Sequence, residues 1–428
     1  MNAVINPSKK MRGTIKVPGD KSISHRSVML GSIASGDTRV SRFLTGEDCL
    51  STIDCFKKLG IDIEVNGTDV IVHGKGLRGL SAPKETLDVG NSGTTLRLMS
   101  GLLSAQPFTS HITGDSSIQK RPMGRVAVPL GLMGAKITSE SEKMTAPLTI
   151  EGASLKGIDY TLPVASAQVK SAIILAGLYA DGITRITEPE ATRDHTEIML
   201  RYLGADIKKE GNTIIVTPVK ELTGKDISVP GDISSAAYFI AAALITRDSD
   251  VIIENVGINP TRTGIITAFE AMGADIELLN ERTVCGEPVA DIRAKTSRLH
   301  GTVIKGDIIP KLIDEIPVIA AVACYAEGTT VIADAQELKV KESDRIKTMA
   351  AELGRMGADI TPTDDGMIIN GGKALKGAIC ESYKDHRVAM SIAVAALGAE
   401  GETQIKEPEC ADISFPGYYD LLLSLREE

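Results

Sequence analysis

The stretch Lys16-Val-Pro-Gly-Asp-Lys-Ser-Ile-Ser-His-Arg26 predicts an extended segment, then a turn at Pro18-Gly19, and then a helix. Asp20 is a favoured N-cap residue, and the apolar residues from Val28 to Ala34 give the helix a surface to bury. We therefore expect a buried helix to open at Asp20.

The first turn of this helix holds two cations and two hydroxyls: Lys21, Ser22, Ser24 and Arg26. A helix N-terminus already presents free N–H groups and a partial positive charge. Adding cations there costs stability unless an anion occupies the site. The alternative is an ordinary solvated helix start, and this stretch alone does not decide between the two.

The composition of the 428 residues is that of a globular protein with two or three domains. Hydrophobic residues make up 43% and charged residues 24%, and the formal net charge is −9. An acidic chain has no general attraction to nucleic acid or to an anionic membrane. The absence of Trp also removes the stacking platforms of single-strand binders. We expect neither a nucleic-acid nor a membrane partner.

The six cysteines are scattered, without the spacing of a zinc site or a disulfide framework. They are typical of small core residues in a reducing compartment. The first residues, MNAVINPSKKMRG, contain no apolar run of signal-peptide length, and no later segment is long and apolar enough for a membrane span. We therefore expect a cytoplasmic protein.

One sequence ending recurs five times along the chain and has the pattern of a helix end, a Gly C-cap and a strand start. The five copies are Leu59-Gly-Ile-Asp-Ile, Met133-Gly-Ala-Lys-Ile, Leu203-Gly-Ala-Asp-Ile, Met272-Gly-Ala-Asp-Ile and Met356-Gly-Ala-Asp-Ile. Apolar helices are predicted to begin near Asp20, Asn91, Ser166, Asp232, Asp314 and Asp385, at intervals of 66 to 82 residues. The chain thus predicts six βαβαβ units, with a further strand in most, and buried apolar helices.

A second repetition predicts the domain boundaries. The sequence Val17-Pro-Gly-Asp20 recurs as Val229-Pro-Gly-Asp232, which suggests two crossings between two three-unit domains, near 19–20 and 230–231. The first domain would hold residues 20–230, and the second 231–428 together with 1–19. A β–α solenoid is the alternative, but solenoid repeats are usually only about 20 to 50 residues long.

The predicted helix starts carry more polar groups than capping requires. Lys or Arg recurs at these positions in unit after unit of an acidic chain: Lys21 and Arg26, Arg97, Arg121, Lys170, Arg193, Lys341 and Arg345, and Arg387. For any single start a solvated surface charge is the usual explanation, because exposed charges contribute little. For the aligned set, a small substrate with several negative charges, such as phosphate and carboxylate, explains the pattern better.

The chain lacks a phosphate-binding GxxxxGK[ST] loop, a GxGxxG after a strand and an HExxH zinc motif. Acid–base chemistry by carboxylates set among cations remains, and Asp314 and Glu342 are the candidates. His25 and His386 occupy matching helix starts, where satisfied structural histidines are the more common case.

In combination, six stretches resemble the 5-enolpyruvylshikimate-3-phosphate synthase family over nearly the whole length. They are Pro18-Gly-Asp-Lys-Ser-Ile-Ser-His-Arg26, Gly90-Asn-Ser-Gly-Thr-Thr-Leu-Arg97, Gly114-Asp-Ser-Ser with Arg121-Pro-Met-Gly124, Ser166-Ala-Gln168, Val340-Lys-Glu-Ser-Asp-Arg345 and Asp385-His-Arg387. The related enolpyruvyl transferase of cell-wall synthesis is less similar, since it lacks the Asp20–Arg26 motif and uses a cysteine loop that is not found here.

The resemblance implies an α/β (α+β) fold: a two-domain inside-out α/β barrel of six repeated units, three per domain, with the active site in the interdomain cleft. It implies transfer of the enolpyruvyl group of phosphoenolpyruvate to the 5-hydroxyl of shikimate 3-phosphate, in the shikimate pathway to chorismate and aromatic amino acids. No metal and no cofactor are implied. We also expect a monomer, with these small molecules as its substrates.

The resemblance further implies two sets of substrate-binding residues. Those expected for shikimate 3-phosphate are Lys21, Ser22, Arg26, Ser166, Gln168, Arg193, Asp314 and Lys341. Those expected for phosphoenolpyruvate are Lys21, Gly93, Arg121, Gln168, Arg345 and Arg387.

The implied mechanism is addition–elimination through a tetrahedral intermediate. Asp314 would accept the proton of the attacking hydroxyl. Glu342 and Lys21 would protonate the phosphoenolpyruvate methylene and later remove a proton.

Two positions depart from the family pattern: Ala167 stands where Ser is common, and a Lys present near the C-terminus of some members is absent at Ile413. Gly93 is retained where larger residues accompany glyphosate tolerance, so we expect inhibition by glyphosate.

A non-enzyme alternative is a two-domain protein that only binds a sugar phosphate or another anion. Such a protein would need the cations but not the carboxylates of Asp314 and Glu342. Replacing each carboxylate by its amide separates the two hypotheses.

Overall fold

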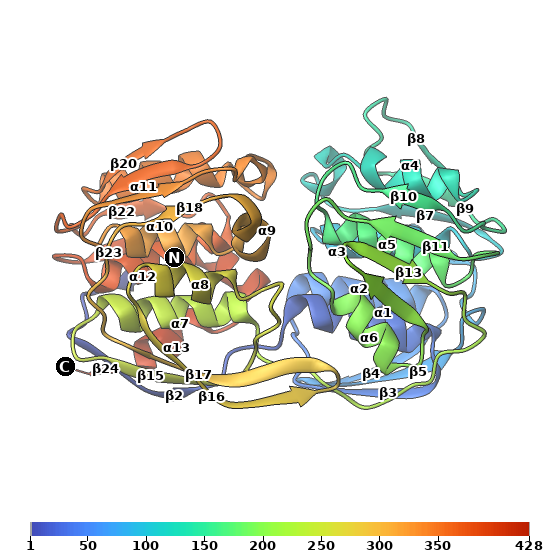
Figure 1. The fold of residues 1–428 in the computed structure, drawn as a ribbon, viewed down its shortest axis with the longest axis horizontal. Helices are drawn as coiled ribbons and strands as arrows, with labels where there is room; N and C mark the ends of the chain where they lie inside the picture. Colours follow the sequence, from blue (N-terminus) through green and yellow to red (C-terminus); the bar gives the residue numbers. More distant parts are fainter. Residues whose placement is uncertain (1, 428) are drawn as a thin grey trace. The chain divides into compact units, whose positions relative to one another are not determined.

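The computed structural model describes residues 2–427 and divides into two compact units. Unit 1 holds Met1–Pro18, Pro230–Thr283 and Pro288–Glu428, and unit 2 holds Gly19–Val229 and Val284–Glu287. The end positions 1 and 428 of the predicted second domain lie outside the described residues. Within the described part of the chain the strands form six small sheets, three in each unit, which confirms the predicted mixed α/β fold (Figure 1).

Unit 2 combines three four-stranded sheets with three pairs of helices. In sheet order the strands are β14 (Ile227–Ser228), β3 (Ser35–Ser41), β5 (Asp69–Lys75) and β4 (Asp62–Asn66); β6 (Leu87–Asp88), β7 (Thr109–Thr113), β9 (Leu148–Glu151) and β8 (Lys136–Ser139); and β10 (Asp159–Thr161), β11 (Thr184–Thr187), β13 (Thr213–Val216) and β12 (Ile207–Glu210). The helices are α1 (Lys21–Ile33), α2 (Glu47–Lys58), α3 (Gly93–Leu103), α4 (Gly124–Leu132), α5 (Ala167–Gly177) and α6 (His195–Tyr202), with a 3-10 turn η1 (Ile118–Lys120).

Unit 1 has sheets of five, four and three strands. In sheet order they are β16 (Asp275–Val284), β17 (Glu287–Lys295), β15 (Asp250–Gly257), β2 (Lys10–Ile15) and β24 (Arg426–Glu427); β18 (Val303–Ile304), β19 (Thr329–Ile332), β21 (Met367–Asn370) and β20 (Asp359–Pro362); and β1 (Asn2–Ile5), β23 (Thr403–Lys406) and β22 (Ile379–Glu381). Its helices are α7 (Ile233–Ile245), α8 (Gly264–Ala271), α9 (Ile309–Leu312), α10 (Ile316–Ala323), α11 (Arg345–Arg355), α12 (His386–Leu397) and α13 (Tyr418–Ser424), with 3-10 turns η2 (Gly306–Ile308), η3 (Gln336–Val340) and η4 (Pro408–Ile413).

All six sheets share one strand pattern. Each contains a parallel pair, and one strand of that pair also has an antiparallel neighbour, as in β10–β11–β13. In four sheets the buried helix lies in the connection between the two parallel strands, for example β10–α5–β11 and β22–α12–β23. A parallel pair requires such a crossover, which explains the helix in each repeat.

In the other two sheets the parallel partner comes from a distant part of the chain. Strand β2 precedes α1 in sequence but pairs with β15, which follows α7. Strand β14 precedes α7 but pairs with β3, which follows α1. The two Val-Pro-Gly-Asp turns lie between each exchanged strand and the next helix, so the chain passes from one unit to the other at these turns.

The apolar helices form the centre of each unit. In unit 2, α3 and α5 pack side by side and α1 contacts α3 and α6. In unit 1, α7, α10 and α12 contact one another and lie among the strands in Figure 1. Residues 316–323, the whole of α10, are buried. Helices buried on every side have no room for a polar face, which matches the sequence prediction.

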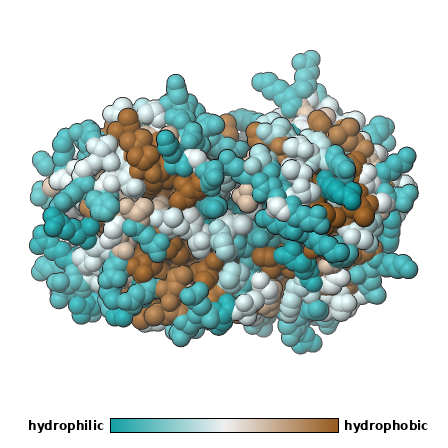
Figure 2. Space-filling model, viewed as in Figure 1, coloured by the Kyte–Doolittle hydropathy of each residue, from teal (hydrophilic) through white to brown (hydrophobic). Residues whose placement is uncertain are grey.

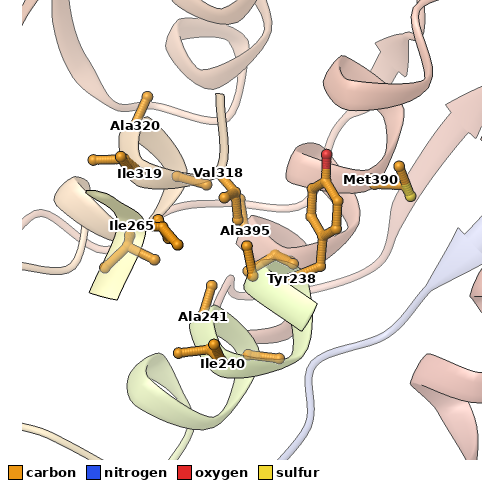
Figure 3. Packing of buried hydrophobic residues seen from close by; sticks show 14 of the residues in the cluster. Tyr238, Ile240, Ala241, Ile265, Val318, Ile319, Ala320, Met390 and Ala395 are labelled. Carbon is orange, nitrogen blue, oxygen red and sulfur yellow. The ribbon is translucent and has the colours of Figure 1, made fainter. Parts of the chain in front are cut away.

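Small residues bring the three central helices of unit 1 together. The close-up in Figure 3 shows Ala241 of α7, Ala320 of α10 and Ala395 of α12 among larger apolar side chains, with Tyr238 alongside. All three alanines are fully buried. A methyl side chain lets helix backbones approach closely while neighbouring Ile and Met residues fill the remaining volume.

One hairpin carries residues of both units. Strands β16 and β17 belong mostly to unit 1, but their turn, Val284–Glu287, belongs to unit 2. In this turn Glu287 pairs with His195 of α6 at 2.7 Å, and both side chains are buried. Sequence reasoning did not detect this arrangement, because a hairpin turn gives no sign of the unit in which it packs.

The visible surface mixes hydrophilic side chains with separate apolar patches (Figure 2). No helix in the described part of the chain has the length and hydropathy needed to span a membrane.

The close contact of α3 and α5 gives a test of the packing. Gly101 of α3 faces Ala172 of α5, and an added Cβ would lie 2.1 Å from the Ala172 carbonyl oxygen. Since overpacking a core of this kind typically costs about 1 to 3 kcal/mol, we expect Gly101→Ala to lower the urea midpoint clearly.

The matched control is Gly131→Ala in α4, where an added Cβ meets nothing within 4 Å. Alanine is the better helix former, so this variant should be neutral or more stable by up to about 1 kcal/mol. If both variants unfold at the same urea concentration, the packing of α3 on α5 is not as described.

Candidate functional site

The N-termini of the buried helices of unit 2 are capped by short polar side chains. Asp20, Ser92 and Ser166 accept hydrogen bonds from backbone N–H groups in the first turns of α1, α3 and α5. The predicted start of the second helix at Asn91 is therefore one residue early, because Ser92 is the cap. The Asn91 amide oxygen accepts a 3.0 Å hydrogen bond from Arg121 instead.

Lys21, the first residue of α1, forms a close ion pair with the Asp48 carboxylate in α2. Both side chains are mostly shielded from solvent, so the pair orients the lysine. Sequence reasoning missed Asp48, because Gly46-Glu47-Asp48 has the pattern of an ordinary acidic helix start.

Arg26 links three helices of unit 2. Its guanidinium donates to Thr196 of α6 at 2.7 Å, to Ser171 of α5 at 3.1 Å and to the Ser22 carbonyl at 2.9 Å. Burial lowers its pKa to about 10, so it stays charged at neutral pH. The carboxylates of Glu197 and Asp20 oppose this effect, and the charge of Arg193 adds to it. Two cations that interact in this way suit an anionic ligand such as a phosphate.

Two further guanidinium groups gather at the start of α3. The Arg97 guanidinium donates to the side-chain amide oxygen of Gln168 in a close contact. The side-chain NH2 group of Gln168 in turn donates to the Thr94 hydroxyl at 3.0 Å. A Cβ added to Gly93 would lie 3.1 Å from a terminal nitrogen of both Arg97 and Arg121. Glycine at this position therefore leaves room for the two guanidinium groups.

Lys170 differs from the other cations at the helix starts. It is completely buried, and its ammonium pairs with Glu188 at 3.0 Å and Glu197 at 2.8 Å. Such a pair ties α5 to α6 but leaves no exposed charge for a ligand. The sequence expectation that the cations share one role therefore fails for Lys170.

In unit 1, the buried Arg345 at the start of α11 is surrounded by three carboxylates. Its guanidinium lies 2.9 Å from Asp385, 2.6 Å from Glu342 and 3.5 Å from Asp314. Burial alone would lower the pKa of Arg345, but these carboxylates together raise it above its ordinary value. Burial would likewise raise the pKa of Asp385, yet Arg345 holds it below the usual range. The Arg345–Asp385 pair therefore stays charged at neutral pH.

The two predicted acid–base residues belong to this cluster. Asp314 lies in the turn before α10, which begins at Ile316 and not at Asp314 as expected. Its carboxylate is 3.3 Å from the Lys341 ammonium and shares Arg345 with Glu342. The structure thus brings together four predicted site residues of unit 1.

Arg387 completes the predicted cations of unit 1. It is the second residue of α12, and its guanidinium lies 3.6 Å from the buried Glu315 carboxylate. Burial would lower its pKa, but Tyr238, Asp314, Glu315 and Asp232 together raise it. Sequence reasoning missed Glu315, which has the pattern of a simple neighbour of Asp314.

The two histidines at helix starts are buried. His25 hydrogen-bonds with Thr52 at 2.7 Å, and burial lowers its pKa to about 3. Burial also lowers the pKa of His386 to about 4. Both imidazoles are therefore neutral at physiological pH, but they are not fully satisfied, because Nε2 of His25 and Nδ1 of His386 are buried without a hydrogen-bond partner among the described residues.

A surface hollow of about 470 Å³ in unit 1 is lined by Arg12, Asp248, Asp250, Lys295 and neighbouring residues. It contains none of the predicted site residues, so it is not part of the candidate site.

Each unit thus gathers the N-termini of buried helices and surrounds them with polar and charged side chains. In unit 2 these are mainly guanidinium groups and their partners, and in unit 1 they also include a carboxylate pair. The class of protein that this arrangement defines is an α/β enzyme for a small substrate with several negative charges.

Comparison with known proteins identifies the family. Residues 5–422 match the family described as EPSP synthase (3-phosphoshikimate 1-carboxyvinyltransferase). The chain therefore belongs to the EPSP synthase family.

Individual relatives agree with this assignment along the whole chain. A 3-phosphoshikimate 1-carboxyvinyltransferase of Brevibacillus brevis is 56% identical over 423 residues, which cover 99% of both chains. One of Thermoanaerobacter sp. is 58% identical over 419 residues, 98% of this chain and 99% of the relative. The crystal structure of EPSP synthase from Acinetobacter baumannii matches with a TM-score of 0.91 and 50% identity, covering 99% of this chain and 98% of that one.

The buried neutral imidazole of His25 gives a pH prediction. Below its ordinary pKa of 6.5 the unfolded chain takes up a proton, whereas the folded chain does so only near pH 3. Stability must therefore fall as the pH falls between these values, by about 2 kcal/mol at pH 5 for this group. We expect urea unfolding of His25→Asn to change less between pH 7 and pH 5 than unfolding of the unmodified chain.

The control is the same change at His111, which is exposed on β7 and should leave the urea midpoint at each pH as it is in the unmodified chain. An equal loss of stability on acidification with and without His25 would contradict the neutral buried imidazole.

Proposed function

We propose that the charged groups of the two units carry out the reaction of the EPSP synthase family in this chain. In that reaction the enolpyruvyl group of phosphoenolpyruvate is transferred to the 5-hydroxyl of shikimate 3-phosphate, and phosphate is released. The product belongs to the shikimate pathway of aromatic amino acid biosynthesis. The enzyme assignment itself rests on the family match and the curated relatives.

The proposed ligands of shikimate 3-phosphate are Lys21, Ser22, Arg26, Ser166, Gln168 and Arg193 from unit 2, with Asp314 and Lys341 from unit 1. The electrostatic interaction between Arg26 and Arg193 supports this proposal, because a phosphate carries two negative charges that a pair of cations can neutralise. The hydroxyls of Ser22 and Ser166 stand at helix starts, where a phosphate oxygen also meets backbone N–H groups.

The proposed ligands of phosphoenolpyruvate are Lys21, Gly93, Arg121, Gln168, Arg345 and Arg387. The two guanidinium groups of Arg97 and Arg121, each 3.1 Å from where a Cβ of Gly93 would lie, support an anion site there. Arg345 and Arg387 are suited to a planar carboxylate, which a guanidinium binds with two parallel hydrogen bonds.

The observation that carries the proposed chemistry is the position of Asp314 between Lys341 and Arg345. The two cations orient this carboxylate, and a carboxylate oxygen can accept a proton. We propose that it takes the proton of the 5-hydroxyl as that oxygen bonds to C2 of phosphoenolpyruvate. Glu342 and Lys21 are the candidates that add a proton to C3 and later remove one, while the C2–O bond to phosphate breaks.

The cations contribute by electrostatic preorganisation. They are held by protein partners, such as Asp48 for Lys21 and Asp385 for Arg345. Negative charge that develops on the carboxylate and on the departing phosphate then meets oriented positive groups without reorganisation.

The expectations of a monomeric, cytoplasmic enzyme without nucleic-acid or membrane partners belong to the same proposal. The net charge of −9 supports the lack of attraction to polyanions. Size-exclusion chromatography with light scattering measures the oligomeric state directly.

The decisive experiment is phosphate release from the purified protein with both substrates, and with each substrate alone. Release should require both substrates, and Asp314→Asn should lower kcat by about 100- to 10,000-fold, the usual contribution of a positioned general base. The matched control is Asp307→Asn at an exposed carboxylate seven residues earlier, which should retain full activity. Unchanged kcat in Asp314→Asn would remove this residue from the mechanism.

Gly93 gives a second test, with glyphosate as the probe. We expect glyphosate to inhibit phosphate release in competition with phosphoenolpyruvate. In Gly93→Ala the new methyl group would crowd Arg97 and Arg121. Loss of a charge-assisted hydrogen bond there should raise the inhibitor concentration needed by about 10- to 100-fold. Full activity of the unmodified chain in millimolar glyphosate would contradict the proposed site.

A further inference from the structure

A buried chain of polar groups in unit 1 ends at Arg387. The Arg262 guanidinium donates to the Ser234 hydroxyl at 2.7 Å, and that hydroxyl donates to the Glu315 carboxylate in a close contact. The same Glu315 oxygen lies 3.6 Å from a terminal nitrogen of Arg387. Arg262 is further paired with Asp232 at 3.3 Å. The Ser234 hydroxyl is thus used both as acceptor and as donor, which fixes its orientation.

This series of linked polar groups connects the starts of three central helices. Ser234 is the second residue of α7, Glu315 is the N-cap of α10 and Arg387 is the second residue of α12. A capping role would be the ordinary explanation for a polar residue at the N-cap of a helix. The Glu315 side chain accepts no capping hydrogen bond in α10, however. Its interactions run sideways, to α7 and α12.

The charge of Glu315 requires a partner, because its side chain is fully buried. An isolated carboxylate in such a place would be very costly, whereas a paired and hydrogen-bonded one is tolerated. Arg387 supplies the opposite charge and Ser234 the hydrogen bond. The electrostatic interaction is mutual, since Glu315 is among the groups that raise the pKa of Arg387.

The surroundings of Arg387 show why its position needs such a partner. Tyr238 of α7 also interacts with the Arg387 guanidinium, and burial raises the pKa of this tyrosine to about 12. Figure 3 shows the Tyr238 ring among the apolar side chains of α7, α10 and α12, with its hydroxyl at one end. The neutral phenol can orient the guanidinium but cannot balance its charge. Asp314, Glu315 and Asp232 all act on this charge, and Glu315 is the one of these three carboxylates whose side chain is fully buried.

We propose that Glu315 is a positioning residue for Arg387, held in place by Ser234 and Arg262, and that it aims the guanidinium at the anionic groups of phosphoenolpyruvate. The proposal rests on the assignment of Arg387 to that substrate in the proposed function. An arginine fixed before binding loses less side-chain entropy when the substrate arrives, so the effect should appear in the affinity for phosphoenolpyruvate.

The test compares two neighbouring serines of α7, both of them buried. Ser234→Ala removes the hydroxyl that donates a hydrogen bond to Glu315. Ser235→Ala removes a hydroxyl that does not belong to this series of linked polar groups. We expect Ser234→Ala to raise KM for phosphoenolpyruvate by about 3- to 30-fold, the size of coupling between contacting residues. KM for shikimate 3-phosphate should change less than about twofold, as expected for a site without shared partners.

Two further variants separate positioning from a general effect on the fold. Ser234→Thr retains a hydroxyl and should recover most of the affinity for phosphoenolpyruvate. Glu315→Gln retains the acceptor for Ser234 but loses the charge, so it should also raise KM for phosphoenolpyruvate. If Glu315→Gln does not fold, as judged by its thermal midpoint, the Ser234→Ala and Ser234→Thr pair decides.

Arg387→Ala distinguishes failure of this inference from failure of the proposed site. If Arg387→Ala raises KM for phosphoenolpyruvate but the Ser234 and Glu315 variants do not, Glu315 is no positioning residue. If Arg387→Ala leaves that KM unchanged, the site assignment and the inference both fall. Equal rises in KM for both substrates in Ser234→Ala would indicate a general structural effect and overturn the inference.

Discussion

The burial of three helices against one another in each unit is the constraint on which the rest of the structure depends. A helix such as α10, buried along its whole length, leaves no side of the cylinder for polar chemistry. The buried polar groups along these helices are small hydroxyls bonded to the helix backbone, such as Ser32 and Ser100, and the charged groups lie near the helix starts, where free N–H groups also need partners. The caps Asp20, Ser92, Ser166, Asp232 and Asp385 meet this need, and a cation follows each of them except Asp232 within the first two turns of the helix. One packing requirement thus accounts for both the core and the location of the charged groups.

The two units balance their cations in different ways. In unit 2 the guanidinium of Arg26 donates to hydroxyls and a carbonyl, while the carboxylates of Glu197 and Asp20 act on it through their charge. In unit 1 Arg345 is surrounded by three carboxylates. An anion that approaches Arg345 competes with Glu342 and Asp314 for the same guanidinium. The environments of the two candidate acid–base residues are therefore coupled by one shared cation.

The local features of this fold could be predicted from the sequence because their causes are local. An N-cap residue before an apolar run, and a glycine after one, mark helix ends wherever the chain folds. The repeated Met-Gly-Ala and Val-Pro-Gly-Asp stretches indicated six similar units and the turns where the chain changes unit. The predicted helix start at Asn91 was one residue early, because the adjacent Ser92 is an equally good cap. The predicted start at Asp314 was two residues early, because Asp314 lies in the turn before α10. The resemblance to a family then supplied roles that spacing alone could not.

The sequence by itself therefore determined the six-unit architecture, the helix starts and the kinds of charged residue placed there. Only the tertiary structure decided which cation meets which anion. Lys21 and Lys170 occupy similar helix starts, yet one pairs with Asp48 and the other is sealed between Glu188 and Glu197. Glu315 and Ser234 are 81 residues apart and become partners through the packing of α7 on α10. Capping depends on neighbours in the chain, whereas ion pairing and burial depend on distances that only the packed helices set.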